Sequence, residues 1–352
     1  MTDVLKAFAA AQESYRAALP AKWDARIAAA AACEDGRIAA ATEAVSAGSF
    51  AACLRALQSA AGECGAGDVV ITNDVYHGSN HPTEVTAATP IVQGGRVRGW
   101  AMLRTEFADI GGWELGAYSP RALDIWSEGA RIVPAKVFRN GAPRREVLDM
   151  LQLNSRTPRL NLACVTSLAR TALSLAGSLA PLASTLGALA DQSEQRAASA
   201  LARVERGEGK AEVPQAGPLR LRITPHGARL SISFPELPAA SAAPLNATRA
   251  MTLDSIVAGI TATLRVDPAA AVALHRLIDL EVAEDRLLSA ARRRPAGWAR
   301  AITGRAVFQA TCDALGASGD AGWPARDPHF DPVSGRLSEA RRSTIETLER
   351  GM

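Results

Sequence analysis

Two short apolar runs, each followed at once by polar residues, constrain the fold of this 352-residue chain more than any other feature. Residues 68–72 (DVVIT) and 97–104 (VRGWAMLR) have the length and the β-branched and aromatic content of strands. The segments that follow them, 73–84 and 106–112, are rich in Asn, Asp, His and Gly, which are typical of loops. Because loops on a rigid sheet often carry binding groups, we expect the functional site here.

The composition argues against a nucleic-acid partner and against a membrane span. Lys and Arg number 39 and Asp and Glu 36, so the net charge is only +3, and aromatic residues make up 5% of the chain. A nucleic-acid-binding surface needs a basic patch, so we expect no nucleic-acid partner. We find no charge-free apolar run of about eighteen residues and no secretory signal pattern, so we expect no membrane span and a cytoplasmic location. Five dispersed cysteines without a Cys-x-x-Cys pair predict reduced thiols.

Helical periodicity and turn residues divide the rest of the chain. Asp35-Gly36, between two Ala-rich runs, predicts a hairpin, although such runs are equally typical of helices. A clearer hairpin is predicted at 218–234, after a polar linker at 208–215, and residues 130–138 are expected to be extended. Helices are predicted at 3–19, 49–62, 144–153, 160–206 with joints at Pro181 and Gly187, 248–264, 268–278, 301–315 and 337–350.

These elements predict an α+β fold. In it, a mixed sheet of short strands carries the site loops, and a large helical portion and a C-terminal region of hairpin and helices follow. A chain of this length can hold two or three structural units. We expect them at residues 1–158, 159–215 and 216–352.

The polar segments hold the side chains best suited to chemistry. His81 and Glu84 are three residues apart, and Glu106 follows the second predicted strand. One imidazole and two carboxylates suit a divalent ion such as Zn or Mn, with coordination positions left open for a substrate. The candidate catalytic residues are His77, Asp109 and Asp74, of which His77 or Asp109 would orient the ligands or act as a general base.

A simpler interpretation stays open for the same residues. His77 and His81 can satisfy backbone groups of a polar loop, and Glu84 and Glu106 can lie on a solvated surface. Three arginines at 292–294 indicate a solvated surface, a partner contact or a phosphate site. The sequence has no P-loop, nucleophile elbow or dinucleotide fingerprint, so we expect any nucleotide to be bound by another chain.

Several separated motifs occur in the order typical of one family. They are GDVVITNDVYHGSNH at 67–81, ADIGG at 108–112, DIWSEG at 124–129 followed by Arg131, Ile132 and Lys136, and NSRTP at 154–158. In these motifs the chain resembles the hydantoinase B family. That family includes the B-type subunits of hydantoinases and 5-oxoprolinases and related subunits of acetone and acetophenone carboxylases. Weaker similarity extends over residues 33–315.

The resemblance implies a division of labour. In this family an actin-like partner of the hydantoinase A type uses ATP to activate a lactam, a ketone enol or bicarbonate, and the B-type subunit helps to complete hydrolysis or carboxylation. In metal-containing members, the positions of His81, Glu84, Glu106 and Phe107 supply ligands. The family has Asp at the second of these positions and a His pair at the last two, so this chain keeps the oxygen donor but loses nitrogen donors.

Three functions agree with these observations. The first is a subunit of an ATP-dependent ketone carboxylase of the acetophenone carboxylase kind, in which a metal would lie near an enolate. We expect it first because short, specialised subunits suit such assemblies, which is an analogy between folds. The second is a subunit of a hydantoinase or 5-oxoprolinase that hydrolyses a cyclic amide. The third is a non-catalytic subunit that docks onto the ATP-binding partner.

Overall fold

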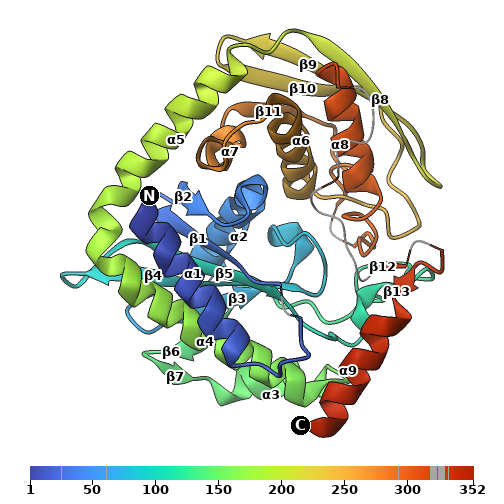
Figure 1. Cartoon of the computed structure of the whole chain (residues 1–352). Helices are drawn as coiled ribbons and strands as arrows, with labels where there is room; N and C mark the ends of the chain where they lie inside the picture. Colours follow the sequence, from blue (N-terminus) through green and yellow to red (C-terminus); the bar gives the residue numbers. More distant parts are fainter. Residues whose placement is uncertain (25, 61, 292, 318–322, 324–329, 332) are drawn as a thin grey trace.

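The computed structural model describes residues 1–24, 26–60, 62–291, 293–317, 323, 330–331 and 333–352. It has two main β-sheets, each covered by helices, and a long helical arm that contacts both (Figure 1). The arm consists of α4 (Pro158–Leu179), a short 3-10 turn, and α5 (Leu186–Leu201). The predicted α+β class is confirmed.

The larger sheet is antiparallel in every described pair and has the order β2-β1-β5-β4-β3-β6-β7. Its strands are β1 (Ala28–Cys33), β2 (Ile38–Ala41), β3 (Val69–Thr72), β4 (Glu84–Gln93), β5 (Arg96–Glu106), β6 (Ala135–Arg139) and β7 (Ala142–Pro143). The prediction of a mixed, short-stranded site sheet needs correction, because its two central strands, β4 and β5, are long and antiparallel.

The sequence gave no sign of β4, which lies between the two strands that were predicted. Its apolar content is mostly Ala and Thr, and Pro90 lies within it. Proline is tolerated at this point because β3 pairs with β4 only as far as Ala88, so Pro90 lies on a part of β4 that pairs with β5 alone. The consequence for the site is that Glu84 begins a strand and does not end a loop.

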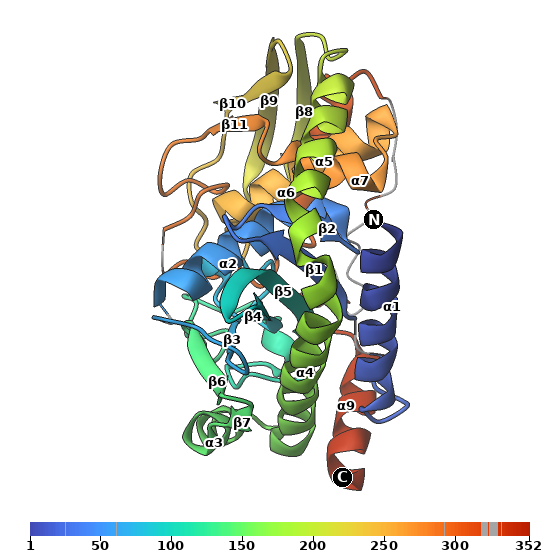
Figure 2. The same cartoon turned by 90° about the vertical axis from the view of Figure 1, so that its left-hand side faces the viewer.

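Helices cover both faces of this sheet. In β5, Arg104 donates from Nη1 to Ser49 Oγ in α2 (Ala47–Ala60) at 2.7 Å, whereas Gly99 faces Leu186 of α5. Side chains at an even and an odd position of one strand point to opposite faces, so α2 and α5 lie on opposite sides of the sheet. Helix α1 (Thr2–Ala17) packs on α4 and β1, and Figure 2 shows it alongside α4.

Burial on both faces also explains the Ala-rich hairpin. β1 consists of five alanines and a cysteine, and every one of them is buried. Small side chains let the neighbouring helices approach the strand closely, so tertiary packing outweighs the helical propensity of alanine. The hairpin predicted at Asp35-Gly36 is confirmed, with Gly36 at a φ of 85°.

The second sheet has the order β11-β10-β9-β8, with a parallel pair between β10 and β11. It packs mainly against α8, and α6 packs in turn against α8 and α2. Its strands and the remaining elements are β8 (Gly207–Val213), β9 (Gly217–His226), β10 (Arg229–Glu236), β11 (Ile278–Glu281), α3 (Arg145–Leu153), α6 (Arg249–Leu264), α7 (Pro268–Leu274), α8 (Thr303–Ala314), β12 (Phe330–Asp331), β13 (Arg336–Leu337) and α9 (Glu339–Gly351).

Strand β8 corrects the predicted linker at 208–215. Its sequence, GEGKAEV, places Glu and Lys outward and Gly, Ala and Val inward, so the period of two is present but its apolar half is nearly invisible. The glycines are needed because a Cβ on Gly209 would lie 1.9 Å from the carbonyl oxygen of Ala310 in α8. The unit boundary expected after residue 215 therefore falls inside a strand hairpin. The helix predicted at 268–278 also ends early, at Leu274.

The helical stretch 158–201 is long and apolar enough to cross a membrane, judged by length and composition alone. Core helices pass the same test. In this chain Leu160, Val165 and Leu168 of α4 are buried, and α4 contacts β4, β5 and α1.

The close packing of β8 on α8 yields a testable prediction. Gly209→Ala should lower the free energy of unfolding by about 1–3 kcal/mol, because the added methyl group overlaps the α8 backbone. Gly177→Ala in α4 is the matched control: nothing lies within 4 Å of its Cβ position, so it should be neutral or stabilising. Urea unfolding of both variants measures the difference, and equal stability would contradict the packing.

Candidate functional site

The structure brings together the two carboxylates predicted to share a metal ion. Glu84, the first residue of β4, is the cross-strand partner of Glu106, the last residue of β5. The segment before β4 returns to the sheet through a backbone hydrogen bond from Phe107 N to the Thr83 carbonyl oxygen, 2.9 Å long. Antiparallel pairing thus produces the juxtaposition, although through a strand that the sequence did not predict.

Arginine side chains, however, already occupy these carboxylates. Arg300 donates from Nη1 to Glu84 Oε1 at 3.2 Å and lies 3.9 Å from Glu106 Oε1. Arg104 Nη1 lies 3.6 Å from Glu84 Oε2, which also accepts a 2.7 Å hydrogen bond from the Asn80 amide. Burial alone would raise the pKa of Glu84, but the two guanidinium groups outweigh it and hold that pKa below its usual value. Glu84 is therefore an ionised, fully engaged carboxylate.

His81 is held in a separate local arrangement. It is buried, its Nδ1 lies 2.7 Å from Thr83 Oγ1, and it accepts a 3.3 Å hydrogen bond from the Thr83 amide at the same nitrogen. Its ring packs against Tyr118, with centroids 4.5 Å apart. These contacts explain its orientation without a metal ion.

The three predicted ligands, as they lie, do not fit a divalent ion. Within the part of the chain that the structure describes, no three His, Cys, Asp or Glu side chains are grouped so that they could share one. The space left beside Glu84 and Glu106 is about 10 Å³, about what a single water molecule needs. Metal binding by His81, Glu84 and Glu106 stays a prediction, and we derive no chemical step from it.

The candidate catalytic residues Asp74 and His77 belong to a loop-holding cluster. Asp74 has a fully buried side chain that accepts hydrogen bonds from the Tyr76 amide, at 3.0 Å, and from Arg131. His77 Nδ1 lies 3.3 Å from Asp74 Oδ2. The Arg131 guanidinium also lies 5.7 Å from the Tyr76 ring centroid and 5.9 Å from that of Trp126, within cation–π range.

Asp109 is likewise engaged on both oxygens. It accepts from the Arg156 amide at 2.7 Å, from the Arg156 guanidinium, and from the Gly111 amide at 3.1 Å. Its backbone carbonyl accepts from Ser155 and Asn161. The 108–112 and 154–158 motifs are therefore one structural unit, and the structure gives Asp109 a role in fixing the loop.

Glu128 is a buried acid that the sequence motifs contained but did not single out. It accepts hydrogen bonds from the amides of Ala296, at 2.9 Å, and Gly297, at 2.6 Å. Burial raises the pKa of Glu128 to about 8, more than these amides lower it. Glu128 fastens the 124–129 motif to a segment more than 160 residues away.

Asp254 of α6 is a second buried acid outside the predicted site. Ser49 N donates to its Oδ1 and Asn80 Nδ2 to its Oδ2, each at 3.1 Å. Burial raises the pKa of Asp254 to about 6. Arg104 donates to Ser49 Oγ, so this acid is connected to the Glu84 cluster through α2.

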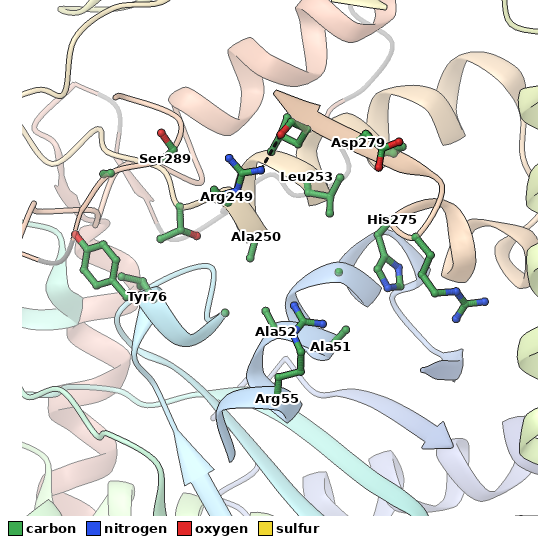
Figure 3. A pocket seen from close by; sticks show the side chains of 18 of the residues that line it. Ala51, Ala52, Arg55, Tyr76, Arg249, Ala250, Leu253, His275, Asp279 and Ser289 are labelled. Atoms are coloured by element: carbon green, nitrogen blue, oxygen red, sulfur yellow. Dashed lines mark hydrogen bonds between the residues drawn. The ribbon is translucent and has the colours of Figure 1, made fainter. Parts of the chain in front are cut away.

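The open space lies on another side of the 73–81 loop. A cavity of about 1160 Å³ is bounded by α2, by Val75, Tyr76 and Gly78 of the loop, and by the first turn of α6 (Figure 3). Arg55 of α2 and Arg249 of α6 stand on facing walls. The predicted residues His77, His81, Glu84, Glu106 and Asp109 do not line it.

The charges around this cavity are mostly neutralised. Asp279 pairs with Arg229 at 2.8 Å and Asp285 with Arg294 at 3.1 Å. Arg249 donates only to backbone carbonyls, those of residues 280 and 282. Within the described residues Arg55 and Glu284 have no ion-pair partner, so Arg55 and Arg249 are the lining arginines without a carboxylate. Among the predicted 292–294 cluster, Arg292 lies outside the described residues.

The lining histidine does not add to this positive charge. His275 stands in the cavity wall, and burial lowers its pKa to about 3. It is therefore neutral near pH 7. The ligand chemistry that suits the cavity is an anion held between Arg55 and Arg249.

Sequence reasoning missed most of the residues that organise this region. Arg131 and Arg156 stand inside the quoted motifs, and their proximity to acidic motifs was a usable signal. Arg104 ends a predicted strand and was visible as a charge in an otherwise apolar run. Arg300 gave no local signal, because its partner Glu84 lies 216 positions away.

Comparison with known proteins gives a consistent result. The family model described as hydantoinase B/oxoprolinase matches residues 22–327. The β subunit of caprolactamase from Pseudomonas jessenii is 32% identical over 94 residues, which are 27% of this chain and 16% of that protein. The 5-oxoprolinase 1 of Arabidopsis thaliana is 33% identical over 90 residues, 25% of this chain and 7% of that protein.

Two solved structures share the fold. The ATP-dependent caprolactamase of Pseudomonas jessenii superposes with a TM-score of 0.77 at 18% identity, covering 92% of this chain and 60% of that one. Nucleotide-free acetone carboxylase superposes with a TM-score of 0.73 at 15% identity, covering 89% of this chain and 48% of that one. This chain thus covers less than two thirds of the length of these relatives.

The raised pKa of Glu128 makes stability depend on pH. Between the ordinary value of 4.5 and about 8 the folded state holds a proton that the unfolded state has lost, so stability falls as pH rises through this window. Glu128→Gln should remove up to about 1.4 kcal/mol of that fall per pH unit. Urea unfolding between pH 5 and 8 measures it, with exposed Glu63→Gln as control. An unchanged slope would contradict a protonated Glu128.

Proposed function

The chain belongs to the hydantoinase B/oxoprolinase family, and from this premise we propose that it is a subunit of an ATP-dependent complex that acts on a cyclic amide. The match over residues 22–327 carries the proposal. The sequence has no nucleotide-binding motif, which agrees with ATP being bound by another subunit. That subunit would be the actin-like, hydantoinase A type partner.

The names of the similar proteins favour a cyclic amide over a ketone. Caprolactamase and 5-oxoprolinase each name a cyclic amide, and both are similar to this chain in sequence. The likeness to acetone carboxylase supports the fold alone, so an acetophenone carboxylase-like function stays a prediction from the sequence. The cytoplasmic location is also a prediction.

The cavity is the part of this chain that suits an activated intermediate. A substrate phosphorylated by the partner is anionic, and Arg55 and Arg249 are placed to pair with an anion. The cluster at Glu84 and Glu106 is closed and charge-neutral, so it offers no comparable space. We therefore propose that this subunit holds the intermediate, or the partner segment that delivers it, in the cavity.

Co-expression with an actin-like ATPase subunit tests the proposed class. We expect a stable complex whose ATP hydrolysis is stimulated by hydantoin, 5-oxoproline or caprolactam, measured as phosphate release. Acetone or acetophenone with bicarbonate is the competing substrate pair. Stimulation by the ketones alone would support the carboxylase function in place of the hydrolase, and failure to bind any such ATPase would contradict both.

A charge reversal tests the cavity. Arg55→Glu should lower substrate-stimulated kcat/KM of the complex by about 10- to 100-fold, because a charge-assisted contact contributes about 1.5–3 kcal/mol. Arg145→Glu makes the same charge change on a highly exposed residue of α3, away from the cavity, and should leave kcat/KM unchanged. Equal kcat/KM values in the two folded variants would remove the cavity from the function.

A further inference from the structure

The cluster around Glu84 contains a cation supplied by the chain itself. Arg300 lies just before α8, and its side chain is buried between Glu84 Oε1, at 3.2 Å, and Glu106 Oε1, at 3.9 Å. Arg104, also buried, lies against the other oxygen of Glu84 at 3.6 Å. Each of the two arginines therefore contributes one positive charge to a buried pair of carboxylates.

We propose that Arg300 takes the place of a divalent ion in this cluster. Its guanidinium bridges the ends of β4 and β5 and fastens the segment before α8 to the sheet. Neither Glu84 nor Glu106 is then a metal ligand in the folded protein. This inference concerns the cluster alone and does not rest on the proposed substrate or partner.

Charge balance supports this substitution. Glu84 and Glu106 together carry two negative charges, and Arg104 and Arg300 carry two positive charges. A divalent ion added to the same cluster would leave two buried positive charges without partners, which is strongly unfavourable away from water. Arginine keeps its proton under all ordinary conditions, so this cation cannot be lost by deprotonation.

Space and donor geometry support it as well. The remaining cavity of about 10 Å³ leaves no room for an ion with bound water. Both oxygens of Glu84 are in use, since Oε2 also accepts from the Asn80 amide at 2.7 Å. A bound ion would have to displace both a guanidinium and a backbone donor.

Metal content of the purified protein is the direct test. After dialysis against Mn²⁺ or Zn²⁺ and gel filtration, we expect wild type, His81→Ala and Glu106→Gln to carry the same metal content, measured by mass spectrometry. Near-stoichiometric metal in wild type that falls at least fivefold in either variant would overturn the proposal. His81 and Glu106 are chosen because their removal does not leave Arg300 without Glu84.

A double-mutant cycle tests the ion pair itself. Arg300→Met and Glu84→Gln each leave a buried charge without its partner, whereas the double variant removes both charges together. We expect the unfolding constant of the double variant to be at least tenfold smaller than the product of the two single effects predicts. Additive effects would overturn the proposal. If a single variant fails to fold, Arg300→Lys replaces Arg300→Met, because it keeps the charge and removes only the planar guanidinium.

Discussion

The ion pair between Arg300 and Glu84 is the constraint on which the rest of the site region depends. A charge buried without a partner would cost several kcal/mol, so the end of β4 and the segment before α8 have to meet. The same carboxylate accepts from the Asn80 amide, which fixes the loop before β4. One interaction thereby positions a sheet end, a loop and the approach to a distant helix.

Other acids in the motifs have the same kind of task. Asp74 holds Arg131, Asp109 holds Arg156, and Glu128 holds the amides of residues 296 and 297. Each joins a loop near the larger sheet to a later part of the chain. Acidic residues that sequence analysis treats as chemistry are, in this structure, the means by which irregular loops are held in one conformation without a metal ion.

This use of the acids places the open space elsewhere. The 73–81 loop presents its charged side chains inward and its Val75, Tyr76 and Gly78 to the cavity. That cavity is completed by α2 and by the first turn of α6, so it depends on helices from both halves of the chain. A subunit built this way can receive a partner's product between two arginines while its interior remains charge-neutral.

The sequence by itself determined the family, the α+β class, most helices and both hairpins, because periodicity and turn chemistry act over a few residues. It also placed Glu84 and Glu106 together at the ends of strands. Only the tertiary structure decided that β4 and β8 are strands, because their inward residues are small and carry little apolar signal. It alone decided what the carboxylates bind, since Arg300 reaches Glu84 from 216 positions away and burial makes that pairing obligatory.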